Sequence, residues 1–175
     1  MGFATDSKRG VEVHYGPRTV EGKFGAEIGD GVVKHVVYDI THQDLSSTSA
    51  AAVTGLEYVF PAGSVFLSCQ YVVDEAIVGP TAITCGTYLA SDGTTAHDAD
   101  GLMTAAVGVV TALDAVGDRV LGTGALLATG TGAAFSTASS TVVNAGGLVL
   151  RILPTVAVAT AGKMRVYVTY LAPQP

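Results

Sequence analysis

Charged residues are scarce in this chain. Of its 175 residues, 14% are charged and 49% are hydrophobic, whereas soluble domains usually carry about 25% charged residues. A monomer with so few charges has difficulty covering its surface with polar groups. We therefore expect part of its apolar surface to be buried against copies of itself or against other partners. The length suits one domain with a sizeable core and a peripheral segment.

Long apolar runs are also absent. The longest uncharged stretch, between Arg119 and Arg151, is rich in Gly, Thr and Ser and includes Asn144, so it lacks the roughly 18 consecutive apolar residues of a spanning helix. The N-terminus has no apolar core typical of a secretory signal. Asp6 occupies the position where a myristoylation signal requires Ser or Thr. We expect a soluble protein made in the cytoplasm, without membrane contact.

The motifs of common enzymes and nucleic-acid binders are missing. The net charge is −6 and the pI is near 5.0, so no basic footprint predicts DNA or RNA binding. Neither G-x-S-x-G nor H-E-x-x-H occurs, and Gly122-Thr123-Gly124 and Gly22-Lys23-Phe24 match no nucleotide-binding loop. The four histidines lack metal-ligand spacing; they are His14, His35, His42 and His97. We expect no catalysis and no cofactor.

One acidic segment calls for a metal hypothesis. Asp92, Asp98 and Asp100 lie close together in sequence, and hard cations prefer clustered oxygen ligands. Asp98 could begin a calcium loop, but the twelfth position is Val109 instead of a bidentate Glu. We predict that these residues form turns, with a weak calcium site as the alternative.

Only two cysteines are present, Cys69 and Cys85, both on apolar faces of predicted strands. Without a C-x-x-C motif or a secretory signal, buried free thiols are the favoured interpretation. A disulfide between adjacent strands is the alternative.

The N-terminal segment differs in composition from the rest. Half of all charged residues fall within the first 45 positions, and residues 1–31 contain seven glycines without a sustained helical or strand period. We interpret residues 1–31 as an extended arm that docks on a polar partner surface, with a solvated terminus as the alternative. Residues 32–175 then form the folded domain.

The pattern of residues 32–175 predicts many short strands separated by glycine-rich turns. We predict strands near 32–41, 56–60, 64–73 and 82–89, a small-residue linker at 46–52 and a turn-rich loop at 91–100. In the strand at 64–73, Val65, Leu67, Cys69, Tyr71 and Val73 alternate onto one face. Residues 105–113 and 119–127 are ambiguous between strand and short helix, and 105–145 as a whole resists assignment.

The C-terminus has the clearest alternation. Leu148, Leu150 and Ile152 form one inward face, and Met164, Val166, Val168 and Tyr170 form another. The connection through Thr160-Ala161-Gly162 favours pairing of these two strands as antiparallel neighbours. The whole pattern predicts an all-β antiparallel sandwich, with the jelly roll as the favoured arrangement, preceded by an extended N-terminal arm.

Several runs resemble a known family. They are Phe60–Val65, Ser68–Ala76, Cys85–Leu89, Asp92–Thr94, Asp98–Leu102, Thr160–Lys163 with Val166–Tyr170, and His14–Arg18. Together they resemble the decoration (cement) proteins of tailed-phage heads, and the resemblance covers most of the chain. It implies a β-sandwich subunit, trimeric, that binds the outer capsid surface where major capsid proteins meet and reinforces the shell against internal DNA pressure.

This hypothesis assigns contacts to the arm. Tyr15, Arg18 and Phe24 are the candidate partner-binding residues, because Tyr and Arg concentrate interface energy and Phe does so to a lesser degree. The alternative is that they pack on their own domain. A second functional hypothesis is a receptor- or carbohydrate-binding knob of a phage tail or head fibre, although aromatics are only 7% and Trp is absent. A cupin-like enzyme would need clustered histidines on strands.

The charge deficit generates the first testable prediction. Purified protein should run as a stable homo-oligomer, because association buries the apolar surface that the charges leave uncovered. Size-exclusion chromatography with light scattering measures this directly. A monomer at micromolar concentration contradicts the prediction.

Overall fold

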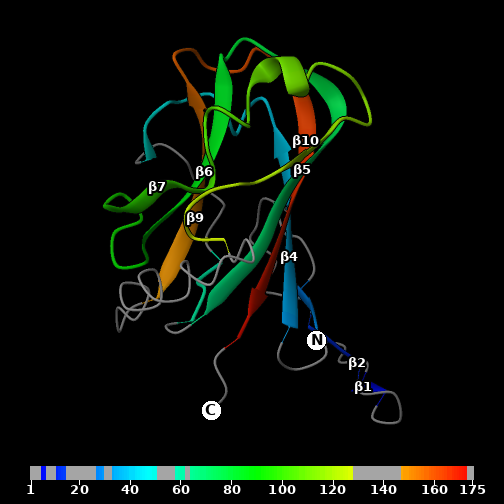
Figure 1. Ribbon diagram of the computed structural model, residues 1–175, viewed down its shortest axis with the longest axis vertical. Coiled ribbons are helices and arrows are strands. Elements are labelled where there is room, and N and C mark those ends of the chain that lie inside the picture. Colours follow the sequence, from blue (N-terminus) through cyan, green and yellow to red (C-terminus); the bar gives the residue numbers. More distant parts are fainter. Residues whose placement is uncertain are drawn as a thin grey trace.

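The computed structural model describes residues 5–6, 11–14, 27–29, 33–50, 58–61, 64–127 and 147–172. Its strands form two antiparallel sheets, a seven-stranded sheet in the order β1-β2-β3-β4-β10-β5-β8 and a three-stranded sheet in the order β7-β6-β9 (Figure 1). The strands are β1 (Thr5–Asp6), β2 (Val11–His14), β3 (Glu27–Gly29), β4 (Val33–Thr41), β5 (Val65–Val78), β6 (Ala82–Leu89), β7 (Ala96–Met103), β8 (Arg119–Leu121), β9 (Leu148–Thr155) and β10 (Ala161–Leu171). The predicted all-β sandwich is confirmed; a jelly-roll strand order stays a prediction.

Strand β10 lies at the centre of the large sheet, between β4 and β5. Its alternate residues Met164, Val166, Val168 and Tyr170 are fully buried, as the sequence pattern predicts. Val166 pairs with Tyr38 of β4 on one side and with Tyr71 of β5 on the other. The inner faces of these three strands therefore form one wall of the core.

The small sheet supplies the opposite wall. Ile83 and Cys85 of β6, with Leu150 and Ile152 of β9, are fully buried and belong to the same cluster as the β10 residues. At one end of the core, Phe60 lies with its ring centroid 5.0 Å from Phe66 and 5.0 Å from Tyr170. Both contacts are edge-on, the favourable arrangement for aromatic pairs.

The predicted pairing of the two C-terminal strands is wrong. β9 pairs with β6 in the small sheet, and β10 pairs with β4 and β5 in the large one. The residues between them carry the chain from one sheet to the other, and Val156 there has a positive φ of 68°. Alternation reports which side of a strand is buried but does not report which strand lies beside it.

The predicted inner face of β5 is wrong at its start. Phe66 is buried, whereas Val65 and Leu67 are partly exposed. Ser68 pairs with Thr169 and Phe66 pairs with Tyr170, so Leu67 is an extra residue in the ladder. This β-bulge reverses the alternation, and a strict period of two cannot anticipate it.

The predicted loop at 91–100 is also partly wrong, because β7 begins at Ala96. Cys85 pairs with Met103 while Thr87 pairs with Asp98, so the β7 ladder is interrupted between these pairs. The interruption brings the Ala99 backbone over Gly86, where a Cβ would lie 2.2 Å from the Ala99 carbonyl. Only glycine allows so close an approach.

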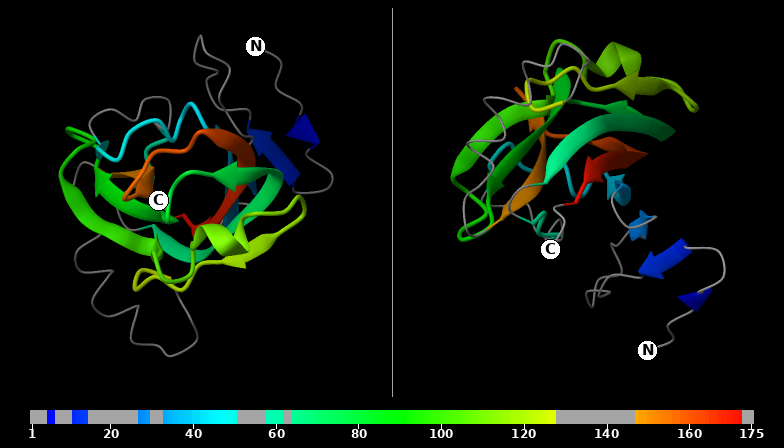
Figure 2. Two further views of the ribbon diagram at one scale, coloured as in Figure 1. Left: turned by 90° about the horizontal axis from the view of Figure 1, so that it is seen from above. Right: turned by 60° about the horizontal axis from the view of Figure 1, so that its bottom comes forward.

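The segment interpreted as an arm without strand period contains three short strands. β3 pairs with β4 through Ile28 and His35, β2 pairs with β3, and β1 pairs with β2. The large sheet therefore continues from β4 into residues 5–29, and Figure 2 shows β1 and β2 leading away from the sandwich. The division into an arm at 1–31 and a domain at 32–175 stays a prediction.

The ambiguous middle region is mostly irregular. Val110–Ala112 is a 3-10 helix, and β8 is a three-residue strand. In the expected strand at 56–60, Phe60 makes an isolated bridge with Leu148; residues 51–57 and 128–146 lie outside the described residues. Within the described ranges, the helical structure is too short to cross a membrane.

Two buried hydroxyls generate a stability prediction. Tyr38 and Tyr71 are almost completely buried, and among the described residues neither hydroxyl has a hydrogen-bond partner. Burial raises the pKa of both phenols well above its ordinary value. Each therefore stays neutral and contributes an unsatisfied polar group to an apolar core.

Replacing Tyr71 by Phe should leave the free energy of unfolding unchanged or raise it by about 1 kcal/mol, because the ring stays and the desolvated hydroxyl is removed. Tyr71→Ala, the matched control, should lower it by about 3–5 kcal/mol. Urea denaturation measures both. A loss of more than about 1 kcal/mol in Tyr71→Phe would show that the hydroxyl is stabilising.

Candidate interaction surface

The outer face of the large sheet carries side chains that keep part of their surface in solvent. β4 contributes His35, Val37 and Asp39, and β10 contributes Lys163, Arg165, Tyr167 and Thr169. β5 adds Ser68, Gln70, Val72 and Asp74, and β8 adds Arg119 and Leu121. Leu121 is 63% exposed, so this face mixes polar groups with accessible apolar surface. Such a mixture is common at protein–protein interfaces.

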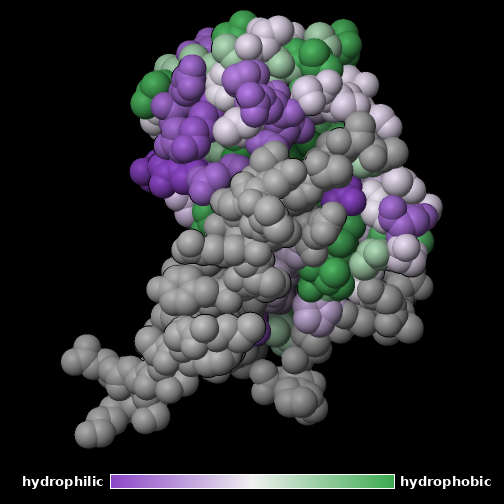
Figure 3. Space-filling model, turned by 180° about the vertical axis from the view of Figure 1, so that it is seen from behind, coloured by the Kyte–Doolittle hydropathy of each residue, from purple (hydrophilic) through white to green (hydrophobic). Residues whose placement is uncertain are grey.

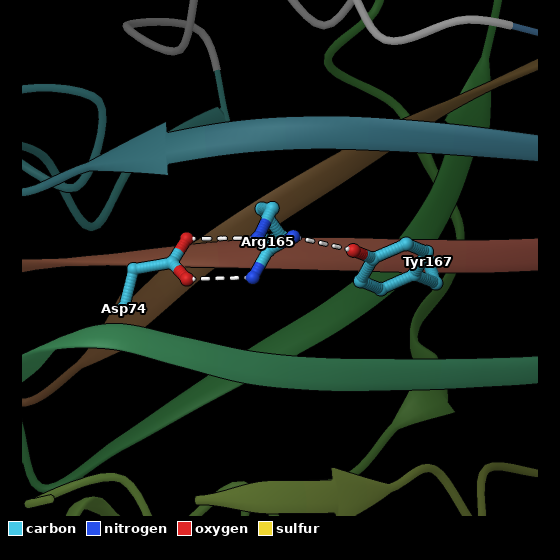
Figure 4. A network of polar contacts seen from close by, with 3 residues as sticks. All are labelled: Asp74, Arg165 and Tyr167. Carbon is cyan, nitrogen blue, oxygen red and sulfur yellow. Dashed lines mark hydrogen bonds and ion pairs between the residues drawn. The ribbon is translucent and has the colours of Figure 1, made fainter. Parts of the chain in front are cut away.

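An ordered polar network lies on this face (Figure 4). Arg165 donates from Nε to Asp74 Oδ2 at 2.9 Å and from Nη2 to Asp74 Oδ1 at 2.7 Å. Its third nitrogen, Nη1, donates to the Tyr167 hydroxyl at 2.9 Å. The guanidinium carbon also lies 5.9 Å from the centroid of the Tyr167 ring. The planar fork of Arg fits a carboxylate in this two-bond arrangement, which fixes its orientation.

The strand register explains how the network forms. Val73 pairs with Met164 and Glu75 pairs with Lys163, which leaves Asp74 without a partner in the ladder. Asp74 follows Gln70 and Val72 at intervals of two residues, so its side chain lies on the same outer face. Arg165 pairs with Val72, which lies two residues before Asp74 on the same face of β5, so the guanidinium reaches the carboxylate diagonally across the two strands. Tyr167 lies two residues along β10 and hence on the same face.

The network is also an electrostatic unit. Hydrogen bonds from Arg165 lower the pKa of the Asp74 carboxyl, with a further contribution from the charge itself. The same bonds raise the pKa of Arg165. Asp74 is therefore ionised at neutral pH, and Arg165 and Tyr167 are held in one geometry. Arg and Tyr held rigidly on an accessible surface are the residue types that dominate binding energy.

A second accessible feature lies at the end of the sandwich that holds the β5–β6 and β9–β10 connections. Val78, Val156 and Val158 are exposed there, and Val156 is 88% exposed. The Thr160 amide donates to the Val78 carbonyl, which holds the two connections together. Figure 3 shows hydrophobic residues along the top of the molecule, where this end lies. A positive φ is uncommon for a β-branched residue such as Val156 and marks local strain.

The predicted arm contacts stay predictions, because Tyr15, Arg18 and Phe24 lie outside the described residues. The strands on either side of them in sequence are β2 and β3. β2 pairs with β3, and β3 pairs with β4. The surfaces of the sandwich and the three arm residues are therefore two separate sets of candidate contacts.

Only Asp92 of the acidic segment forms a turn; the prediction is wrong for Asp98 and Asp100, which lie in strand β7. Asp92 Oδ1 accepts hydrogen bonds from the Thr94 and Thr95 amides, and its Oδ2 accepts one from the Thr95 hydroxyl. These bonds lower the pKa of Asp92 to about 2. Asp98 instead accepts from the Asp100 amide, and burial raises its pKa. The turn-forming role is confirmed for Asp92.

No metal-binding group is found within the described part of the chain, where no three His, Cys, Asp or Glu side chains come together. His35 contacts the Thr169 hydroxyl and His97 contacts the Thr87 hydroxyl. Both histidines are thus engaged in local hydrogen bonds between neighbouring strands.

A buried arginine supports the turn that contains Asp92. Arg151 of β9 is only 8% exposed, and its Nε donates to the Gly93 carbonyl at 3.0 Å. A further bond runs from Nη1 to the Leu150 carbonyl. Because a buried guanidinium must be hydrogen-bonded, this side chain fixes the β6–β7 turn against β9.

Comparison with protein-family models and with curated proteins finds no match. Among solved structures, the chain is similar to one described as "Cyanophage Pam1 capsid asymmetric unit", with 23% sequence identity and a TM-score of 0.46. The alignment covers 83% of this chain and 89% of that chain.

The ion-pair network generates a prediction about titration. In the Arg165→Gln variant, the pKa of Asp74 should rise toward its ordinary value, because the hydrogen bonds that favour the carboxylate are lost. A lowered folded-state pKa stabilises the fold above the unfolded-state pKa, and this contribution is lost as pH falls through the folded-state pKa. Stability should therefore depend less on pH in the acid range in the variant.

NMR titration of the Asp74 carboxyl, with urea denaturation at several acid pH values, measures both effects. Lys163→Gln is the matched control, because Lys163 acts on Asp74 through charge alone and to a smaller extent. An Asp74 that titrates at the same pH with and without Arg165 contradicts the assignment.

Proposed function

We propose that this chain is a structural, non-catalytic virion protein that decorates the outer surface of a tailed-phage capsid. In this proposal it binds the major capsid protein and reinforces the shell as a homo-oligomer, with a trimer favoured by the resemblance noted in the sequence. It is synthesised in the host cytoplasm and located on the outer capsid surface.

The observation that carries the proposal is the continuation of the large sheet into the N-terminal segment. β1, β2, β3 and β4 lie side by side in the same order as in the chain, and each is antiparallel to the next. None of the first three strands pairs with a strand of the small sheet. A ribbon of this kind extends beyond the sandwich and suits contact with a neighbouring protein.

Composition supports the same proposal. Charged residues make up 14% of the chain and hydrophobic residues 49%, whereas soluble domains usually carry about 25% charged residues. The accessible valines Val78, Val156 and Val158 and the exposed Leu121 show where part of that apolar surface lies. Burial of such surface between subunits stabilises an assembly in proportion to its area.

The outer face of the large sheet offers a second contact area. Arg165 and Tyr167 are already ordered by Asp74 before any partner binds, so binding costs little further side-chain entropy. In an oligomer each arm and each sheet face is repeated, and linked contacts gain avidity from their high effective concentration. Modest individual contacts are then enough for stable decoration.

Deletion of residues 1–31 tests the role of the arm. The remaining chain should stay folded, because the buried core draws on β4 and later strands, but binding to purified empty heads should fall by about 100-fold or more as avidity is lost. Co-sedimentation with heads measures binding, and circular dichroism with urea denaturation checks the fold.

The combined variant Tyr15→Ala, Arg18→Ala and Phe24→Ala separates side-chain contacts from arm length and should weaken binding in the full chain. Lys8→Ala is the matched control within the same segment and should bind as the unaltered protein does. A truncated protein that stays folded and decorates heads normally removes the arm from the proposal.

A further inference from the structure

The two cysteines lie on opposite walls of the core. Cys69 belongs to β5 in the large sheet and Cys85 belongs to β6 in the small sheet. Their exposed fractions are 1% and 0%, and both belong to the same core cluster. They are not adjacent-strand neighbours, as the sequence alternative assumed, but face each other across the sandwich.

The two thiols belong to one buried cluster and come from opposite sheets. Interaction with the Cys69 thiol, together with burial, raises the pKa of Cys85 well above its ordinary value. The Tyr38 and Tyr71 phenols are close enough to interact electrostatically with both cysteines. All four side chains belong to the same buried core cluster.

We propose that Cys69 and Cys85 are a latent disulfide pair that can join the two sheets covalently when the chain meets a small-molecule disulfide as oxidant. Both thiols are free in the structure. They are the two cysteines of the chain, so an intramolecular bond can form only between them. The inference concerns the isolated protein and does not depend on the proposed capsid function.

The chemistry proceeds by two exchanges. One protein thiolate attacks the small-molecule disulfide, forms a mixed disulfide and releases the first small thiol. The second protein thiolate attacks the protein sulfur of that mixed disulfide, forms the Cys69–Cys85 bond and releases the second small thiol. The two cysteines lose two protons and two electrons in total, and the oxidant is reduced to two thiols.

Burial controls when this reaction occurs. The thiolate is the nucleophile, and both thiols are enclosed by the core with the pKa of Cys85 raised. The closed sandwich should therefore resist oxidation, and the bond should form when the sheets open or while the chain folds. Once formed, the bond should resist reductants for the same reason.

The bond should stabilise the fold. A bonded pair needs a sulfur–sulfur distance of about 2.05 Å, so the two sulfur atoms must move together for the bond to form. The Cys69–Cys85 bond would close a loop of about 15 residues and would thereby reduce the conformational freedom of the unfolded chain. For a chain of this size, we expect the melting temperature to rise by about 10 °C.

The test uses the full purified chain. It is unfolded in urea with oxidised glutathione, refolded by dilution, alkylated and digested with a protease that cleaves at Asp, since Asp74 separates the two cysteines. A parallel sample goes through the same cycle without oxidant. The expected results are an intact mass about 2 Da lower before alkylation, a peptide that links Cys69 to Cys85, and a higher melting temperature than in the parallel sample.

Cys69→Ala and Cys85→Ala are matched controls that should show no oxidant-dependent rise in melting temperature. Folded protein without urea should oxidise at least about tenfold more slowly than unfolded protein. The proposal is overturned if the oxidised chain fails to refold, melts at or below the temperature of the reduced chain, or forms only bonds between chains. Equal oxidation rates with and without urea also overturn it.

Discussion

The contact between the inner face of β10 and its two neighbours is the constraint on which the rest of the structure depends. Val166 lies between Tyr38 and Tyr71, and all three side chains are almost completely buried. This row sets the spacing of β4 and β5 and presents a continuous wall to the small sheet. Strand β4, from which the ladder continues toward the N-terminus, and strand β5, which carries Asp74, are both held in register by β10.

Much of this arrangement is readable from the sequence. The inward residues of β10 follow from strict alternation, and the bounds of β6 are the predicted ones. The wrong predictions share one physical cause. Alternation along a strand reports which of its faces is buried, whereas the errors concern which strands pair and in what register. The Leu67 bulge, the interrupted β7 ladder and the separation of β9 from β10 are set by strands distant in sequence.

The candidate site was less accessible to sequence analysis. Arg165 and Tyr167 show the spacing of two residues on one strand face, which is a detectable signal. Asp74 could not be assigned to them, because the pairing of β5 with β10 that brings it beside Arg165 joins strands far apart in the chain. The sequence also identified both cysteines as buried, but their opposition across the core emerges only from the assignment of β5 and β6 to different sheets.

Both edges of the large sheet are built in a way that bears on aggregation. At one end, β8 is only three residues long and begins with the exposed Arg119. The chain then turns inward at Gly122, whose amide donates to the Cys69 carbonyl. A short, charged terminal strand is a poor template for fibril growth. At the other edge, β1 is two residues long and includes Asp6. Both edges are therefore short and carry a charge, which protects a chain poor in charged residues from uncontrolled polymerisation.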